Sequence, residues 1–114
     1  MQFDRFTAVL LILRPDAPVL DDEAAAALQD AHMSHLADLY DAGVLLAVGP
    51  LFDDVYRGLS IFSVGPEDAL AFANADPAVQ SGRFSVKVIP WMIPGGLISF
   101  TKGRLPRSMA ETDS

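Results

Sequence analysis

Cysteine is absent from this chain of 114 residues, and that absence excludes a whole group of chemistries. Disulfide bonds, thiolate nucleophiles, cysteine-bound zinc and iron–sulfur clusters all need a residue type that the sequence lacks. Basic residues are also scarce, since 8 Lys and Arg stand against 15 Asp and Glu, for a formal net charge of −7. A chain with this negative charge is repelled by the phosphate backbone of a nucleic acid, so we expect no nucleic-acid partner.

Long apolar runs are missing as well. The longest early run, residues 8–13, is too short to span a membrane and has charged residues on both sides. No signal peptide is visible, so we expect a cytoplasmic protein without a membrane partner. The apolar fraction is nevertheless high, at 51% with a mean hydropathy of +0.30, which excludes disorder and predicts one globular domain.

Hydrophobic patterning predicts four strands and two helices in the order β-α-β-β-α-β. The strands are expected at residues 7–13, 44–48, 57–64 and 84–90, and the helices at residues 21–42 and 66–75. This order is typical of the split βαβ, or ferredoxin-like, α+β fold, an antiparallel four-stranded sheet with both helices on one face. The first strand is apolar at nearly every position, so we expect a second copy of the chain to cover the other face.

Both histidines of the chain, His32 and His35, fall in the first predicted helix. At 100° per residue they lie about 60° apart on the apolar side of that helix, facing the sheet. Imidazole accepts and releases protons near neutral pH, so a histidine held under the sheet suits general-base chemistry. The alternatives are a core histidine bonded to a backbone carbonyl, the more common role for either residue alone, and a metal site, for which no third ligand is evident.

Asp76 ends the second predicted helix and points inward, where an acid is costly unless it has a partner. One interpretation is an N-cap, in which Pro77 starts a short turn and the carboxylate accepts the N–H of Ala78 or Val79. The other interpretation pairs Asp76 with a histidine of the neighbouring helix. A buried carboxylate in that position fixes the imidazole tautomer and raises its basicity.

A few further residues are weaker candidates for a binding site. The turn at Gly49 and Pro50 closes the second strand, where a ligand can approach the backbone, although turn geometry explains it equally well. Arg57 and Arg83 each stand at the start of a predicted strand. One interpretation is that they bind an anion, and the other is that they only mark the end of a strand at the edge of the sheet. Trp91 either lines a pocket or packs in the core.

Four segments follow one another with a specific spacing: HLADL (35–39), GVLLAVGPL (43–51), EDALAFANADPAV (67–79) and VKVIPW (86–91). In this order they resemble the YCII-related family, over roughly residues 6–91. The resemblance implies a ferredoxin-like fold of the dimeric α/β-barrel type. It also implies a His–Asp pair in a pocket, which the family pattern places at His35 and Asp76. Related barrels include cofactor-free isomerases and dehydrohalogenases.

We therefore predict a small-molecule enzyme of the lyase, isomerase or dehydrochlorinase type, without a cofactor or a metal ion. His35 would be the general base and Asp76 its orienting partner. The residues expected to line the substrate pocket are Gly49, Pro50, Phe72 and Trp91. The alternative is a non-catalytic dimeric module that binds a small ligand or serves in a stress response, with the same pair as a structural hydrogen bond.

The C-terminal end departs from the family pattern. We expect residues 1–92 to form the YCII-like domain and residues 93–114 to form an extension. Residues 97–100 are apolar, and the extension carries three basic side chains, Lys102, Arg104 and Arg107. Because an ordered terminus needs something to pack on, we expect this extension to dock on a neighbouring subunit of a homodimer or larger homo-oligomer.

Overall fold

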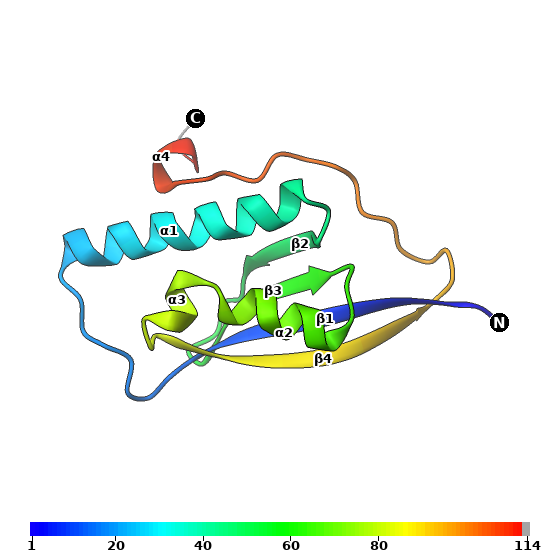
Figure 1. The fold of residues 1–114 in the computed structure, drawn as a ribbon, viewed down its shortest axis with the longest axis horizontal. Helices are drawn as coiled ribbons and strands as arrows, with labels where there is room; N and C mark the ends of the chain where they lie inside the picture. The colour runs from blue at the N-terminus through cyan, green and yellow to red at the C-terminus, as the bar shows by residue number, and fades with distance from the viewer. Residues whose placement is uncertain (113–114) are drawn as a thin grey trace.

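The computed structural model describes residues 1–112 of the chain (Figure 1). Four strands and two main helices follow one another in the predicted order, and two short helices are added. The elements are β1 (Phe3–Leu13), α1 (Asp22–Asp41), β2 (Leu45–Pro50), β3 (Tyr56–Phe62), α2 (Pro66–Asn74), α3 (Pro77–Gln80), β4 (Phe84–Pro94) and α4 (Met109–Thr112). The predicted α+β fold of the ferredoxin-like type is confirmed.

The four strands form one antiparallel sheet in the order β2-β3-β1-β4. β1 lies inside the sheet, because it pairs with β3 on one side and with β4 on the other. Its side chains alternate between the two faces, and those of Thr7, Val9 and Leu11 are buried on the helix side. The near-continuous apolar sequence of β1 therefore serves both faces of the sheet.

β1 and β4 are both longer than the sequence pattern predicts. The extra residues at the start of β1 pair with the extra residues at the end of β4, from Phe3 opposite Pro94 to Phe6 opposite Trp91. Pro90 suggests the end of a strand, but β4 is an edge strand, where a residue without an N–H group is tolerated. The ribbon of these two strands consequently extends beyond the rest of the sheet (Figure 1).

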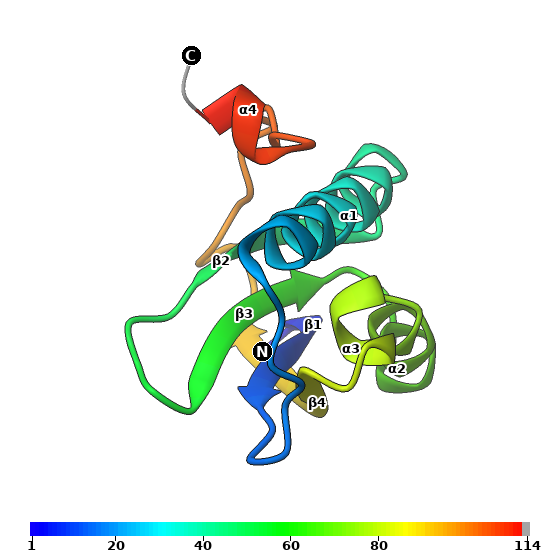
Figure 2. The same cartoon turned by 90° about the vertical axis from the view of Figure 1, so that its left-hand side faces the viewer.

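α1, α2 and α3 all lie over the same face of the sheet (Figure 2). α1 begins where the Asp21 carboxylate accepts the N–H of Ala24 at 2.8 Å, and the chain turns away from it at Gly43, which has a φ of 77°. None of the described helices is both long and apolar enough to cross a membrane. The core between helices and sheet is formed by Val9, Leu39, Leu45, Phe62, Ala69 and Ala73.

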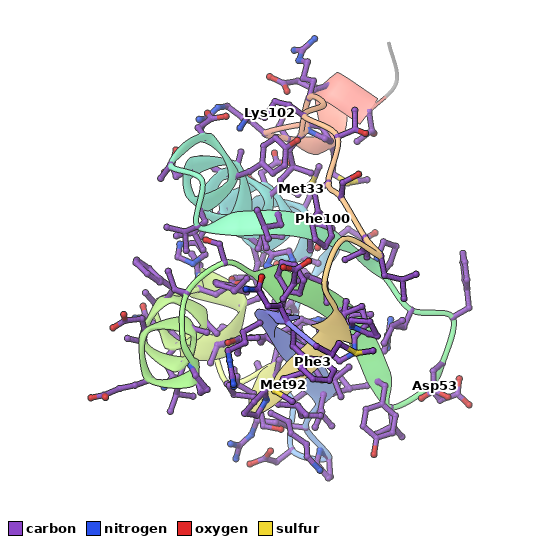
Figure 3. All side chains as sticks on the ribbon, turned by 90° about the vertical axis from the view of Figure 1, so that its right-hand side faces the viewer. Phe3, Met33, Asp53, Met92, Phe100 and Lys102 are labelled. Atoms are coloured by element: carbon purple, nitrogen blue, oxygen red, sulfur yellow. The ribbon has the colours of Figure 1, made fainter. Side chains whose placement is uncertain are left out.

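The opposite face of the sheet carries apolar side chains that no helix covers. Phe6 and Trp91 lie side by side on it, with ring centroids 6.3 Å apart, and Trp91 is 39% exposed. Phe100 lies on the segment that leads away from β4 (Figure 3). Its ring packs edge-on against that of Phe6, with the ring centroids 5.3 Å apart. The extension thus covers part of this face, and the pairing of two such faces in a barrel stays a prediction.

After β4 the chain returns along α1 and ends in α4 (Figures 1 and 2). The Arg107 guanidinium donates hydrogen bonds to Asp38 at 2.8 Å and to Asp41 at 2.7 Å, both on α1. The described part of the extension therefore packs on α1 of its own chain. Docking on a neighbouring subunit stays a prediction, and residues 113–114 lie outside the described residues.

Candidate functional site

His32 projects from the sheet-facing side of α1 and meets a carboxylate from the neighbouring junction between α2 and α3. Its Nδ1 lies 2.7 Å from Oδ2 of Asp76, and the two side chains are 14% and 3% exposed. An ionised carboxylate can only accept hydrogen bonds, so Nδ1 of His32 carries the hydrogen. In the neutral imidazole this leaves Nε2 with a free lone pair, which is the arrangement that a general base requires.

Asp76 occupies the junction between α2 and α3. Pro77 at the first position of α3 keeps the preceding residue out of the α region, and Asp76 is extended, with φ −63° and ψ 127°. Its Oδ1 accepts the N–H of Ala78 at 2.9 Å, while Oδ2 faces His32. The predicted N-cap is confirmed, and the same carboxylate is also the partner of a histidine. One oxygen serves each role, so the two interpretations do not compete.

His35 does not bind Asp76, and the predicted hydrogen bond between them is wrong. Its Nε2 lies 2.9 Å from the carbonyl oxygen of Phe72 on α2. A carbonyl oxygen only accepts, so Nε2 of His35 carries the hydrogen and its lone pair lies on Nδ1. The histidine that pairs with the carboxylate is His32, for which the family resemblance implied no role.

The directions of α1 and α2 explain which histidine meets which partner. β1 and β3 are antiparallel, so the helices that follow them run in opposite directions over the sheet. A step of three residues forward on α1, from His32 to His35, corresponds to a step of four residues back along the chain, from Asp76 at the junction to Phe72 on α2. A helical wheel gives the side of the helix on which a residue lies. It does not give the residue's position along the axis relative to the neighbouring helix, and that position decides the pairing here.

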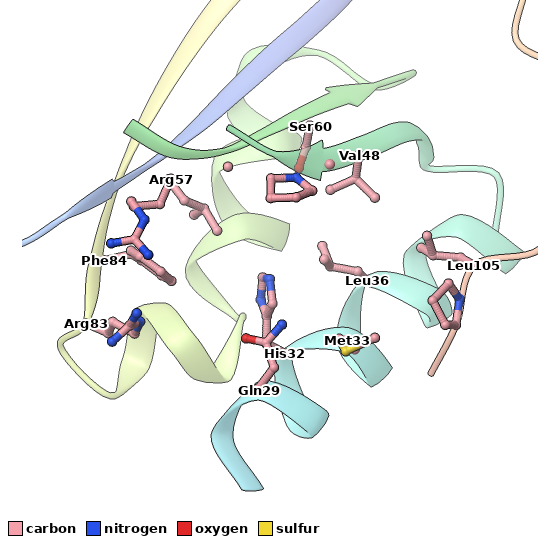
Figure 4. Close-up of a pocket in the computed structure, with 15 residues that line it drawn as sticks. Gln29, His32, Met33, Leu36, Val48, Arg57, Ser60, Arg83, Phe84 and Leu105 are labelled. Atoms are coloured by element: carbon pink, nitrogen blue, oxygen red, sulfur yellow. The ribbon is translucent and has the colours of Figure 1, made fainter. Parts of the chain in front are cut away.

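The His32 ring points into a pocket of about 350 Å³ between α1 and the helix-covered face of the sheet (Figure 4). The floor comes from β2 and β3, and the C-terminal extension contributes Leu105 and Pro106 at one side. This volume lies in the range of pockets that hold small organic molecules. A ligand in this pocket would therefore contact the imidazole of His32, and residues of a single chain form the pocket.

His35 borders a very different space. The void beside it measures about 10 Å³ and is enclosed by core side chains that include Leu39 and Phe62. That volume has room for about one water molecule and for no organic ligand. Open access to the imidazole is what distinguishes a working base from a structural histidine, and the structure gives that access to His32.

Of the four residues predicted to line the substrate pocket, two line the pocket of His32 and two do not. Gly49 and Pro50 border the pocket with His32, next to the end of β2. Phe72 instead offers its carbonyl to His35, and Trp91 stands on the opposite face of the sheet beside Phe6. The strand register explains Trp91, because its partner in β1 points away from the helices.

Arg57 and Arg83 also line the pocket, together with Gln29 of α1. The sequence marked both arginines only as starts of strands that either hold an anion or end a sheet edge. Across residues 1–112, no group of three or more acidic or histidine side chains is placed so that it could bind a metal ion. The prediction of a reaction without metal or cofactor stays a prediction.

The fold and this site define a class: a ferredoxin-like α+β domain with a His–Asp pair between its helices and a pocket at the imidazole. Comparison with known families finds that residues 7–92 match the YCII-related domain. The chain therefore belongs to the YCII-related domain family. A search of curated proteins finds no match.

Solved structures that resemble this chain include the following two. The first is 5-chloro-2-hydroxyhydroquinone dehydrochlorinase from Burkholderia phenoliruptrix AC1100 in complex with 2,5-dihydroxybenzoquinone, at 18% identity and a TM-score of 0.57, covering 75% of this chain and 92% of that one. The second is a dimeric protein of unknown function with a ferredoxin-like fold from Bacteroides fragilis NCTC 9343, at 17% identity and a TM-score of 0.45, covering 79% and 97%. At these identities the first likeness supports the fold alone.

Proposed function

We propose that this chain is a small-molecule enzyme that transfers a proton with His32 and Asp76, using no metal ion and no organic cofactor. The observation that supports the proposal is the position of the His32 imidazole. A buried carboxylate holds one of its nitrogens, and the ring borders a pocket large enough for a substrate (Figure 4). A purely structural histidine gains nothing from such a pocket, whereas a general base depends on it.

In the proposed reaction Nε2 of His32 takes a proton from a carbon next to a carbonyl group of the substrate. The electron pair of that C–H bond then forms a new double bond, and Asp76 stabilises the imidazolium. In an isomerase the proton returns to another atom of the same substrate. In a dehydrochlorinase the electrons expel chloride, and the proton passes from His32 to water.

A dehydrochlorinase, whose reaction is of the proposed class, shares this fold, but at 18% identity the likeness assigns neither a reaction nor a substrate to this chain. The second candidate is a non-catalytic module that binds a ligand in the same pocket. The hydrogen bond between Asp76 and His32 favours the enzyme, because binding alone does not call for a fixed tautomer with a free lone pair. The two candidates differ in one measurable property, the transfer of a proton.

The proposal includes a homodimer in which two sheets meet face to face. The uncovered face of the sheet presents Phe6, Ile89 and Trp91, and contiguous apolar surface of this kind is typical of an interface between subunits. The pocket at His32 lies on the other side of the sheet and is formed by one chain. Sedimentation equilibrium tests the dimer, and a stable monomer at micromolar concentration would contradict it. A cytoplasmic location stays a prediction from the sequence.

Solvent deuterium exchange tests proton transfer before the physiological substrate is known. The protein is incubated in D₂O with enolisable acids, ketones and hydroxyquinones, and proton NMR follows the loss of C–H signals. We expect faster exchange for at least one of these classes, and a loss of about 100-fold or more in His32→Gln and Asp76→Asn. Asp54→Asn, in the exposed loop between β2 and β3, is the matched control and should leave the rate unchanged. Exchange at the uncatalysed rate for every class would favour the ligand-binding module.

A further inference from the structure

Two guanidinium groups stand at one end of the pocket. Arg57 projects from β3 and Arg83 from the segment just before β4, and both lie on the same side of His32 (Figure 4). The Phe84 ring lies between them, with the Arg83 guanidinium 5.0 Å from its centroid. Segments distant in the sequence thus bring two positive charges and an aromatic face to one end of a single cavity.

Neither of these arginines has a carboxylate partner among the described residues. Of the four arginines outside the pocket, Arg14, Arg104 and Arg107 each pair with an acidic side chain, whereas Arg5 has no ion pair among the described residues. The pocket itself is lined by fifteen described residues, none of which is acidic. In a chain with a net charge of −7, two cations without counter-ions in one cavity are an unusual placement. Such a placement suits an anionic ligand, because guanidinium binds carboxylate with two parallel hydrogen bonds.

The other end of the pocket is apolar. Met33, Leu36 and Leu105 lie on the side of His32 away from the arginines (Figure 4). The imidazole therefore stands between a cationic end and an apolar end. A ligand that is complementary to both ends of the pocket has a negatively charged group near the arginines and a hydrocarbon body near the apolar residues. The carbon that joins these two parts then faces His32.

We propose that the pocket binds a small organic acid with an apolar or aromatic body, whose carboxylate is held by Arg57 and Arg83. This inference deepens the proposed proton transfer and rests on it for the role of His32, but the binding part stands on the arginines alone. The carboxylate orients the acid so that a carbon near it meets Nε2 of His32. The reaction class is then proton abstraction from a carboxylic acid rather than from a neutral ketone.

Binding of benzoate, compared with its neutral isostere benzamide, tests the charge requirement. Titration followed by ¹H–¹⁵N NMR gives both dissociation constants and shows which residues respond. We expect benzoate to bind at least about tenfold more tightly than benzamide, with shifts at Arg57, Arg83 and Phe84, and to lose affinity as salt is added. Equal binding of the two compounds, or no benzoate shifts in the pocket, would overturn the proposal.

Variants separate this proposal from the proposed reaction. Arg57→Gln and Arg83→Gln should each weaken benzoate about tenfold, Arg57→Lys should weaken it less, and Arg14→Gln should leave it unchanged. His32→Gln should keep benzoate affinity within about twofold while deuterium exchange is lost. Benzoate binding that depends on the arginines, without any exchange activity, would refute the enzyme and keep the anion site. Exchange that depends on His32 but is indifferent to both arginine variants would refute the anion site and keep the enzyme.

Discussion

Two neighbouring turns of α1 each carry a histidine, and the surroundings of the two side chains differ sharply. His32 has a carboxylate at Nδ1 and borders a pocket of about 350 Å³. His35 donates from Nε2 to a backbone carbonyl and borders a void of about 10 Å³. The same residue type, three positions apart on the same face of the same helix, is open to a ligand in one case and closed into the core in the other.

The difference comes from the partners and not from α1. A carboxylate offers a full negative charge to a proton that arrives on the far nitrogen of the ring, whereas a carbonyl offers only a dipole. Asp76 occupies its position because Pro77 ends α2 there and starts α3. The chemistry of His32 is therefore determined by a helix break 44 residues further along the chain.

Exchanging the two histidines for glutamine is the most direct way to break this comparison. His32→Gln should lower the rate of catalysed deuterium exchange by about 10²–10⁴, the usual contribution of a positioned general base. His35→Gln should keep the rate within about tenfold of the wild type, because its ring does not face the pocket. A loss of equal size in both variants would place the two histidines in one functional unit.

Asp76 should give the largest change in stability of any residue in this region. It is 2% exposed, caps α3 and holds His32, so Asp76→Ala leaves the Ala78 N–H and the imidazole Nδ1 without their acceptor. We expect a loss of about 3 kcal/mol in the free energy of unfolding, measured by urea denaturation. Asp76→Asn keeps an acceptor for Ala78 and should lose only about 1 kcal/mol. Equal losses would mean that the charge, and not the cap, carries the stability.

The sequence predicted the fold better than the site, for a physical reason. The order of strands and helices follows from local patterns: the apolar run of β1, the acids at the start of α1, and Gly-Pro before α2. Errors occur where tertiary pairing decides, as in β4, which passes through Pro90 because it lies at the sheet edge and pairs with β1 along its whole length.

The site depends almost entirely on tertiary relations. The inward direction of Asp76 was predicted from its position on the helical wheel, and its capping role was one of two interpretations, drawn from the following Pro77; both signals are local. The choice between His32 and His35 depends on how far α2 is displaced along α1, which no pattern within either helix contains. Trp91 was misplaced for the same reason, since the register of β4 against β1 decides which face it occupies.

The C-terminal extension offers a smaller test of the same comparison, because it contributes Leu105 and Pro106 to the pocket of His32 and nothing to the void beside His35. Arg107 is one of several residues that attach it to α1, and the pKa of its guanidinium is raised by hydrogen bonds, first to Asp38 and then to Asp41. Arg107→Ala should partly release the extension.

Hydrogen exchange measures this release. The N–H of Gly103 donates to the Tyr40 hydroxyl at 2.7 Å, and its exchange should accelerate in Arg107→Ala and in high salt. Arg104→Ala is the control, because Arg104 is 82% exposed and lies 3.6 Å from its nearest carboxylate oxygen. Benzoate shifts should change in Arg107→Ala, while the signals of His35 stay in place. Unchanged protection of Gly103 would show that contacts other than the ion pairs of Arg107 hold the extension.

The smallest effect is expected at Asp53, which caps a surface loop much as Asp76 caps α3, but in full contact with water. Its carboxylate accepts the N–H of Tyr56 at 2.8 Å and that of Val55 at 2.9 Å, and these bonds lower its pKa from the ordinary value of 3.8. Because the folded pKa is the lower one, the stabilisation is complete above the unfolded value and is lost as the pH falls through the folded value. Asp53→Asn should therefore lower the unfolding midpoint slightly at pH 7 and leave it unchanged at pH values below the folded pKa of Asp53, so that the midpoint of the variant varies less with pH. Thermal unfolding between pH 2.5 and 7 measures both, and a change at neutral pH as large as that of Asp76→Ala would show that burial does not separate the two caps.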